Sequence, residues 1–431
     1  MKTIVALATP AGNSGVAVIR ISGENSKSIL QKLTKQDMEF EPRKMYLKNV
    51  YFGDLIDICL VVFFANPFSF TGEDVAEIHS HGGYYVAQQI INECIELGCS
   101  SAEAGEFSKR AFINGKMSID QAEGIMDLIN AESEMQAKAG SSLMQGKLKQ
   151  KIEEYQNLLT EILADIEAKL DYPEYDYTED ETTNIKSKID CLIDDFSSLI
   201  NESKNGLMIK NGIKIAIVGA PNVGKSSLLN ALTKSDKAIV TNIAGTTRDV
   251  VEAEYEFNGI MFRLFDTAGI HESDDIVEQI GINKALKTLE DADLVLKISS
   301  PDDICEIETS KPYINVFNKT DILKGKKSDN YFYVSAVNNE NIDNLKQEIF
   351  NKTISGNINS DKLYLTNTRH IEAIKQARST LENVIEIFDF STMDIISSEI
   401  KRAWASLGEI SGVTSDEAII DKIFSKFCLG K

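Results

Sequence analysis

Short apolar runs alternate with amphipathic stretches along the first 117 residues. The apolar runs have the length and composition of strands, and residues 57–64 are too apolar to lie outside a core. The sequence predicts strands at 3–9, 15–22, 46–52, 57–64 and 74–79 and helices at 25–33 and 84–97. We therefore expect an α+β domain with its own core in residues 1–117.

From about Ser118 the pattern changes to a helical period. Apolar side chains recur mostly at steps of three and four residues, which places them on one face of a long helix. They are Leu143, Leu148, Ile152, Tyr155, Leu159, Ile162, Ile166 and Leu170. We expect a break or a kink at Gly140-Ser141-Ser142, an end at Tyr172-Pro173, and an acidic solvated loop at 174–181. With further helices expected at 184–203, 371–389 and 393–407, the pattern predicts a helical bundle.

Between these helical stretches, residues 212–356 return to short apolar runs. Strands are expected at 213–218, 252–257, 261–265, 313–317 and 331–334, with Asn258-Gly259 as a hairpin turn. Helices before and after such a unit favour one helical domain into which the unit is inserted. The expected fold class is multidomain α/β, with an α+β domain over 1–117, a helical domain over 118–211 and 357–431, and an inserted domain over 212–356.

The length, composition and net charge of the chain exclude several classes of protein. The 431 residues suit two or three domains, and 43% apolar and 26% charged residues are ordinary for a globular protein. Because the chain has no membrane-spanning apolar run and no signal-peptide layout, we expect a cytoplasmic protein that does not enter a membrane. Six cysteines without a Cys-x-x-Cys pair and four histidines predict neither a disulfide framework nor a zinc site. The net charge of −21 argues against generic nucleic-acid binding but not against a local basic patch.

Residues 219–226 read Gly-Ala-Pro-Asn-Val-Gly-Lys-Ser and join an apolar run to a helix-forming stretch. A strand, a glycine-rich turn and Lys-Ser at the start of a helix make a phosphate-binding loop. Its backbone N–H groups form an anion site, Lys225 reaches the β- and γ-phosphates, and the Ser226 hydroxyl binds Mg²⁺. The alternative is a chance glycine turn, which the full pattern disfavours. We expect a bound nucleoside triphosphate.

Three further motifs follow in the order of a Ras-like P-loop GTPase domain. Residues 266–269, Asp-Thr-Ala-Gly, end a strand, where Asp266 can hold Mg²⁺ through water. Residues 318–321, Asn-Lys-Thr-Asp, fit a guanine reader, because the Asp321 carboxylate can accept from the ring N–H and the exocyclic amine of guanine. Ser335-Ala336 supplies a backbone N–H for the guanine carbonyl. Alone, residues 318–321 could equally be a polar loop, but the ordered set predicts a GTPase.

The residues that would catalyse GTP hydrolysis are harder to identify from the sequence than those that would bind GTP. Many GTPases place a glutamine after Asp-Thr-Ala-Gly to orient the attacking water, but Ile270 stands there. An arginine finger from a partner is one remedy. Another combines a monovalent cation bound by Asn222 and by carbonyls of 241–249, Thr247 on Mg²⁺, and Glu278 orienting water. We favour K⁺-assisted hydrolysis on dimerised G domains. The residues expected to contact GTP are Asn222, Val223, Gly224, Lys225, Ser226, Ser227, Thr241, Asn242, Ile243, Ala244, Gly245, Thr246, Thr247, Asp266, Thr267, Ala268, Gly269, Asn318, Lys319, Thr320, Asp321, Ser335 and Ala336.

Together these motifs resemble those of the MnmE (TrmE) family of tRNA-modification GTPases. GAPNVGKSSLLNAL, TNIAGTTRD and DTAGI lie between helical stretches, and the sequence closes on FCLGK. The N-terminal part contains TIVALATPAGNSGVAVIRISG, FTGEDVAEIHSHGG and EFSKRAFINGKMSIDQAEGIMDLI. The resemblance covers the whole length. It implies a folate-binding, dimerising N-terminal domain, a helical domain and an inserted G domain.

The resemblance also implies an activity. Members of this family, together with an FAD-dependent partner subunit, add a carboxymethylaminomethyl group to carbon 5 of the wobble uridine of certain tRNAs, with a tetrahydrofolate derivative. We expect a homodimer, a heterotetramer with the partner, and GTP hydrolysis that drives approach and separation of the G domains. The alternatives are a ribosome-assembly or regulatory GTPase switch and a one-carbon enzyme with a regulatory GTPase.

Individual site residues follow from the family motifs. Arg20, Glu77, Lys116 and Lys431 fall on the folate contacts, since Arg and Lys suit a glutamate tail and a carboxylate suits the pterin amine. Singly, each is also explained by a surface salt bridge. The resemblance gives Cys428 a catalytic place near the folate, whereas its apolar neighbours favour packing.

In the G domain the resemblance implies two metal sites and an acid. The K⁺ ligands are Asn222, Thr241, Ile243 and Thr246, the Mg²⁺ ligands are Ser226 and Thr247, and the catalytic acid is Glu278. The chain departs from the family at His271, where relatives often have Arg. Residues 302–312 are also short for the helix usually found between two G-domain strands.

Overall fold

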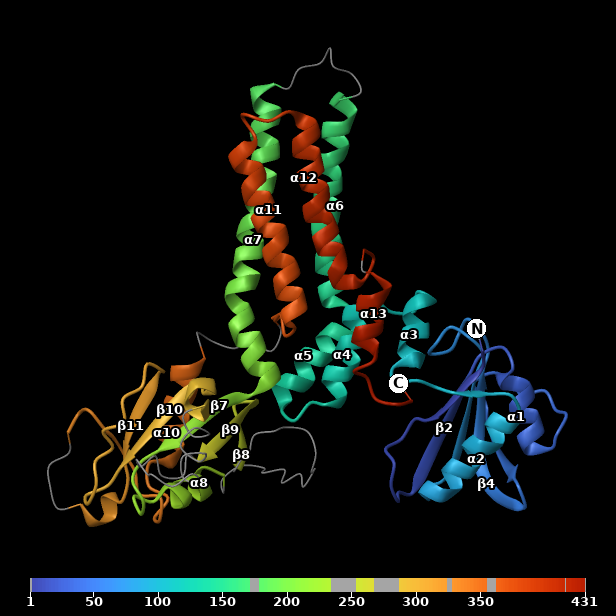
Figure 1. The fold of residues 1–431 in the computed structure, drawn as a ribbon, viewed down its shortest axis with the longest axis horizontal. Coiled ribbons are helices and arrows are strands. Elements are labelled where there is room, and N and C mark those ends of the chain that lie inside the picture. The colour runs from blue at the N-terminus through green and yellow to red at the C-terminus, as the bar shows by residue number, and fades with distance from the viewer. Residues whose placement is uncertain are drawn as a thin grey trace, which may run out of the picture. The chain divides into compact units, whose positions relative to one another are not determined.

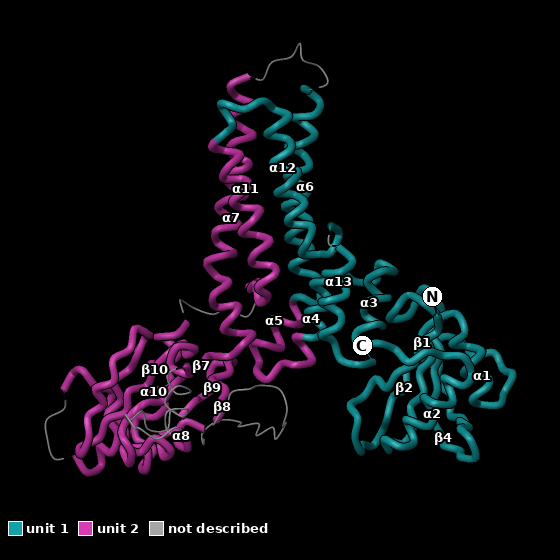
Figure 2. Tube along the Cα trace, in the orientation of Figure 1, with its two compact units in different colours: residues 1–126, 143–176, 387–431 teal, residues 127–142, 177–386 magenta. Residues whose placement is uncertain are grey.

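The computed structural model describes residues 2–170, 178–233, 253–266, 287–323, 328–354, 362–414 and 416–430. The chain divides into two compact units (Figure 2). Unit 1 comprises residues 1–126, 143–176 and 387–431, and unit 2 comprises residues 127–142 and 177–386. Each unit is thus built from segments that are far apart in the sequence. No described helix is both long and apolar enough to cross a membrane.

Unit 1 begins with a six-stranded sheet in the order β3-β4-β5-β2-β1-β6. Its strands are β1 (Ile4–Leu7), β2 (Val16–Ser22), β3 (Met45–Phe52), β4 (Leu55–Phe64), β5 (Val75–His81) and β6 (Ser100–Ser101). β1 and β6 pair in parallel, and the other neighbours are antiparallel. Helices α1 (Ser26–Thr34) and α2 (Tyr84–Glu96) share one core with the sheet (Figure 1). The α+β organisation expected for this part is confirmed.

The two faces of this sheet are covered differently. Side chains such as Ile19 and Ile78 point into the core with α1 and α2. Successive residues of a strand point to opposite faces, so Arg20 and Glu77 belong to the other face. There, α3 (Glu106–Ile113) packs Phe107 against β1. Beyond α3, at β3 and β4, this face is exposed and apolar; its exposed members include Met45, Leu47, Ile56, Ile58 and Leu60.

Unit 1 also contains long helices. They are α6 (Lys147–Leu170) and α12 (Met393–Ser411), with the shorter α13 (Glu417–Phe424) near the end of the chain and α4 (Ile119–Ile129), whose residues 127–129 belong to unit 2. α6 and α12 lie side by side along their lengths (Figure 1). The α6 stripe from Leu148 to Ile166 is buried, which confirms its predicted packing role.

The expected break at Gly140-Ser141-Ser142 is wrong. These residues lie inside α5 (Glu134–Met144), and the chain turns at Gly146, whose φ is +80°. A Cβ at Gly140 would lie 2.6 Å from the backbone nitrogen of Leu128 in α4. The glycine therefore permits a close approach between two helices rather than ending one.

The helix before the G domain is longer than expected. α7 spans Glu179–Asn211, and its first turn includes acidic residues that the sequence analysis placed in a solvated loop. Thr178 and Glu181 form a capping box, and carboxylates favour a helix N-terminus, which explains the earlier start. α7 belongs to unit 2, and the other long helix of unit 2 is α11 (Thr368–Ile387).

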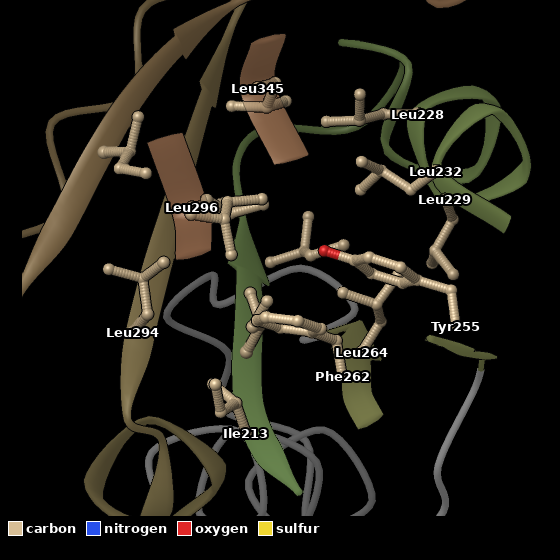
Figure 3. Packing of buried hydrophobic residues seen from close by; sticks show 14 of the residues in the cluster. Ile213, Leu228, Leu229, Leu232, Tyr255, Phe262, Leu264, Leu294, Leu296 and Leu345 are labelled. Atoms are coloured by element: carbon tan, nitrogen blue, oxygen red, sulfur yellow. The ribbon is translucent and has the colours of Figure 1, made fainter. Parts of the chain in front are cut away.

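Unit 2 contains the second sheet, in the order β12-β11-β10-β7-β9-β8. Its strands are β7 (Ile213–Val218), β8 (Ala253–Phe257), β9 (Ile260–Asp266), β10 (Leu294–Ser299), β11 (Tyr313–Phe317) and β12 (Phe332–Tyr333). The β8–β9 hairpin is antiparallel and the other pairs are parallel. Helices α8 (Lys225–Thr233) and α10 (Ile342–Thr353) contribute Leu228, Leu232 and Leu345 to its core (Figure 3), where the Tyr255 and Phe262 rings stack with centroids 5.1 Å apart. The predicted P-loop α/β fold is confirmed.

Candidate nucleotide site and a second polar cluster

The parallel strands of unit 2 bring the expected motifs to one edge of the sheet. β7, β9, β10 and β11 run in the same direction, so their carboxyl ends lie together. The phosphate loop follows β7, Asp266 ends β9, residues 318–321 follow β11 and Ser335 follows β12. Ligands of open parallel sheets bind outside this edge.

The phosphate loop is a tight turn at the end of β7. Asn222 has a φ of +65° and Gly224 a φ of +95°, and α8 begins at Lys225. The Lys225 ammonium folds over the turn and donates to the carbonyl oxygens of Gly219, at 2.8 Å, and Ala220, at 3.2 Å. A cation and the free N–H groups of a helix start are thus presented together, as a phosphate requires.

Asn318 joins the phosphate loop to the loops that are expected to hold the base. Its Nδ2 donates to the Val223 carbonyl oxygen at 3.0 Å, and its Oδ1 accepts from the Ala336 N–H at 3.1 Å. The residue is only 2% exposed. A Cβ at Gly224 would lie 2.4 Å from the same amide nitrogen, so glycine is needed there. Three motifs that are distant in sequence therefore form one hydrogen-bonded unit.

The predicted guanine reader is also held from both sides. The Ser335 hydroxyl donates to Asp321 Oδ1 at 2.6 Å, while Asp321 itself is exposed at the edge of the sheet. The Thr320 N–H donates to the Val334 carbonyl oxygen at 3.2 Å. Asp321 is thereby oriented by its neighbours and still accessible to a ligand.

Lys319, within the same motif, adopts a φ of +60°. Its ammonium lies 3.8 Å from the Asp302 carboxylate. Asp302 opens the segment between β10 and β11, and residues 301–312 form no helix, in agreement with the short length of this segment.

Asp266 ends β9 directly opposite Ile217 of β7, two residues before the phosphate loop begins. Burial raises the pKa of this carboxyl above its usual range, and the charge of Lys225 offsets only part of that effect. Its Oδ1 is buried and has no hydrogen-bond partner among the residues that the structure describes. A buried oxygen with this unmet capacity fits a hydrated cation such as Mg²⁺.

Several predicted site residues lie outside the described part of the chain. They are Thr241, Asn242, Ile243, Ala244, Gly245, Thr246, Thr247, Thr267, Ala268, Gly269, Glu278 and Lys431, together with Ile270 and His271. Of the expected metal ligands, Asn222 and Ser226 are described, and both are exposed within the phosphate loop.

A second polar cluster lies in unit 1, on the sheet face opposite α1 and α2. Arg20 of β2 stands directly across from Glu77 of β5, and its Nε donates to Glu77 Oε1 at 2.8 Å. His79 Nε2 lies 3.3 Å from the other carboxylate oxygen. Burial raises the pKa of Glu77, but the hydrogen bond from His79 and the charge of Arg20 outweigh it, so the net pKa is lowered. The Arg20 guanidinium also lies over the rings of Phe70, at 5.4 Å, and Phe107, at 5.8 Å.

The end of the chain reaches this cluster. Arg20 donates to the Gly430 carbonyl oxygen at 3.4 Å, and the Gly105 N–H donates to the Cys428 carbonyl oxygen at 3.4 Å. The Cys428 residue is exposed. Lys116 is exposed too, and its Cε lies 3.1 Å from the position of a Cβ at Gly72, in the loop that carries Phe70. Arg20 and Glu77 thus form one site beside the C-terminal segment.

Sequence reasoning missed two polar residues of unit 1. His79 alternates with Glu77 along β5, and this spacing could have marked it as a same-face neighbour. The buried Arg110 was also missed; its guanidinium pairs with Glu73 at 2.9 Å and with Glu106 at 2.7 Å. Only the spacing of Glu106 and Arg110, four residues apart on a helix, signalled that pair.

Comparisons with known proteins cover the whole chain. The family model described as MnmE helical domain matches residues 119–428, and the one described as GTP-binding protein TrmE N-terminus matches residues 3–116. The tRNA modification GTPase MnmE of Natranaerobius thermophilus is 38% identical over 454 residues, and the protein of the same name from Mesoplasma florum is 41% identical over 449 residues. Each alignment covers 100% of this chain and 99% of the relative.

Two solved structures match part of the chain. The G domain of the T. maritima FeoB iron transporter is 28% identical, with 33% of this chain and 99% of that domain covered and a TM-score of 0.26. Aquifex aeolicus Era is 27% identical, with 38% of this chain and 65% of that chain covered and a TM-score of 0.27.

Proposed function

The chain belongs to the MnmE (TrmE) family of tRNA modification GTPases, and on that premise we propose that its GTP hydrolysis supports the addition of a carboxymethylaminomethyl group to carbon 5 of the wobble uridine in certain tRNAs. The observation that best supports GTP binding is the buried side-chain amide of Asn318. It links the phosphate loop to Ala336 and to the expected guanine-recognition motif. One rigid edge can therefore hold both ends of GTP.

In this proposal different residues bind the phosphates, the guanine base and the Mg²⁺ ion. Lys225 and the start of α8 bind the phosphates, with Val223 and Ser227 flanking that contact. Asp321, oriented by Ser335, selects guanine, because an amino group and a ring N–H both face a carboxylate. Ser226, Thr247 and Asp266 would hold Mg²⁺, which supplies neutralisation of the phosphate charge when bound.

The guanine assignment is tested by changing one acceptor. Asp321→Asn replaces a carboxylate oxygen with an amide donor, so GTP affinity is expected to fall by about 100-fold or more, since charged hydrogen bonds are worth ~1.5–3 kcal/mol each. Xanthosine triphosphate, which offers a carbonyl in place of the amine, should bind the variant better than the parent. Equal GTP affinity in both proteins would contradict the assignment.

Hydrolysis in this proposal is assisted by K⁺. Asn222 is exposed at the phosphate loop, where its side-chain oxygen can bind a monovalent cation with Thr241, Ile243 and Thr246. Glu278 orients the attacking water, on G domains brought together in a dimer. The GTPase rate should be clearly higher in KCl than in NaCl of the same ionic strength, and equal rates would exclude K⁺ assistance.

A tetrahydrofolate derivative is proposed at the Arg20 cluster. Arg20, Glu77 and the family-matched Lys116 and Lys431 provide the charges, while Phe70 and Phe107 offer aromatic faces beside the guanidinium. A carboxylate that is kept ionised can accept from a pterin amine. Arg20→Gln should weaken binding of tetrahydrofolate to the full chain, as measured by calorimetry, and unchanged binding would place the ligand elsewhere.

The exposed apolar face of β3 and β4 supports a homodimer. An apolar patch of this kind on a soluble domain usually marks an interaction site. Leu47→Lys, on β3 of that face at 67% exposure, should convert the dimer to a monomer in sedimentation, without loss of fold. A dimer that persists in this variant would place the interface elsewhere.

The remaining partners follow from charge and chemistry. A net charge of −21 is poorly suited to tRNA alone, so an FAD-dependent partner subunit in a heterotetramer would supply much of the tRNA contact and the redox chemistry. Cys428, which is exposed two residues before the Gly430 carbonyl that Arg20 contacts, is proposed to act in that chemistry, in the cytoplasm. Mass spectrometry of wobble uridines in a deletion strain tests the function as a whole, and unchanged nucleosides would refute it.

A further inference from the structure

Residues 127–136 run from the last turn of α4 to the first turn of α5, and they contact the β8–β9 hairpin and Lys210, which lies at the end of α7 directly before β7. We propose that this segment, here called the strap, positions β7 and β9 and passes their nucleotide-dependent displacement to α4. The inference rests on the proposed binding of GTP at the edge of the sheet. β7 leads into the phosphate loop and β9 ends at Asp266, so movement at the nucleotide reaches these two strands first.

The first contact caps helix α5. The Glu134 N–H donates to Glu256 Oε1 at 3.0 Å, and the Met135 N–H donates to the Gly259 carbonyl oxygen at 2.9 Å. N–H groups in the first turn of a helix have no acceptor within the helix. The β8–β9 hairpin therefore provides hydrogen-bond acceptors for two N–H groups of α5. The Met135 side chain is buried in the core of the G-domain sheet, alongside Phe262.

The second contact is an ion pair with a residue of β9. Arg263, three positions before Asp266, pairs through one guanidinium nitrogen with Glu132 of the strap at 2.5 Å. Its Nε lies 3.3 Å from Glu254 on β8. Arg263 thus ties the hairpin strands to each other and to the strap.

The third contact is at the entrance to β7. Lys210, three positions before Ile213, pairs with Asp127 at 2.9 Å. The Gln136 side chain donates to the Lys210 carbonyl oxygen at 3.0 Å. The two ends of the strap therefore hold the chain immediately before the strand that leads to the phosphate loop.

The strap is not packed solidly against this entrance. A cavity of about 180 Å³ lies between them, lined by Asp127, Gln136, Gly140, Lys210 and Thr366 among others. The Thr366 hydroxyl is buried and has no hydrogen-bond partner among the described residues. Polar contacts around an open cavity can be rearranged without breaking a close-packed core, which allows the strap two positions.

The strap is continuous with unit 1. α4 runs from Ile119 to Ile129, and its residues 119–126 belong to that unit. A shift of the strap is therefore passed along the backbone into the part of the chain that carries the Arg20 cluster. Arg263 and Glu132 are positioning residues in this view, because they touch neither the nucleotide nor the metal.

Hydrogen exchange tests this directly in the full chain. The amides of Glu134 and Met135 would be followed without nucleotide, with GDP, and with a non-hydrolysable GTP analogue. Their exchange should differ by about fivefold or more between the GDP and analogue states, the lower end of typical coupling between two sites. In Glu132→Gln and in Lys210→Gln that difference should shrink while analogue affinity is unchanged.

A matched control removes an ion pair elsewhere. Glu382→Gln breaks the Arg378 pair on α11, at 3.3 Å, and should leave the nucleotide-dependent difference intact. Analogue binding with the same exchange of both amides in all states would overturn the inference alone. Equal loss in the control would overturn it too, whereas failure of the chain to bind the analogue would contradict the proposed function.

Discussion

The side-chain Nδ2 of Asn318 lies 3.0 Å from the carbonyl oxygen of Val223, although the two residues are 95 positions apart. One buried amide thereby fixes the spacing between the loop after β11 and the loop after β7. In the proposed complex these loops hold the guanine and the phosphates, so the bond sets the distance between the two ends of the nucleotide pocket before GTP arrives.

Asn318→Ala should therefore weaken both the fold and the ligand site. It leaves the Val223 carbonyl and the Ala336 N–H without their partner in a buried place, which costs about 1–3 kcal/mol of unfolding free energy. GTP affinity should fall with it. Denaturant unfolding and nucleotide titration would measure the two effects. Asn315→Ala is the control, because that exposed amide donates to the Asn330 carbonyl oxygen at 3.3 Å and should change stability by less than ~0.5 kcal/mol; equal losses in both variants would contradict the bridging role.

Gly140→Ala should destabilise the protein even though alanine is the better helix former. A Cβ at this position would lie 2.6 Å from the Leu128 backbone nitrogen, and overpacking of this kind costs about 1–3 kcal/mol, more than the ~1 kcal/mol gained in propensity. Gly15→Ala is the control. A Cβ at this exposed position would have no neighbour within 4 Å, so thermal unfolding should be nearly unchanged. A stabilised Gly140→Ala protein would show that the helices can separate freely.

Gly140 and Asn318 show which features of the fold cannot be predicted from the sequence. The hydrophobic period predicted most strands of the two sheets and the long helices, and the motifs predicted the order of the nucleotide-binding loops, because those signals are local; β6 and β10 were not among the expected strands. Gly140 was misread as a break because a glycine that ends a helix and one that lets another helix pass are identical in sequence. The Asn318 bridge and the burial of Arg110 between two carboxylates depend on contacts that form only in the folded chain.

Glu77→Gln should lower stability in a pH-dependent way. The pKa of Glu77 is lowered from its ordinary value of 4.5, so the folded state favours the carboxylate. Its contribution is therefore present above pH 4.5 and is lost as pH falls through the lower folded pKa. Unfolding free energies of parent and variant should differ at neutral pH and converge in acid. Glu96→Gln, exposed at the end of α2, is the control and should follow the parent throughout; a constant difference at every pH would refute the ion-pair explanation.

Asp266→Asn should have the opposite sign. Burial raises the pKa of this carboxyl, which means that the folded state without metal disfavours its charge. The penalty is present above the folded pKa and disappears as pH falls through it, so the nucleotide-free variant should unfold at a higher temperature than the parent at neutral pH, with no difference in acid. GTP hydrolysis should nevertheless drop by about 100-fold or more, because a charge aimed at the metal and phosphates is gone. A variant that is both less stable and inactive would indicate that Asp266 serves the fold, whereas a gain in stability paired with lost hydrolysis identifies a carboxylate kept charged for the ligand it binds.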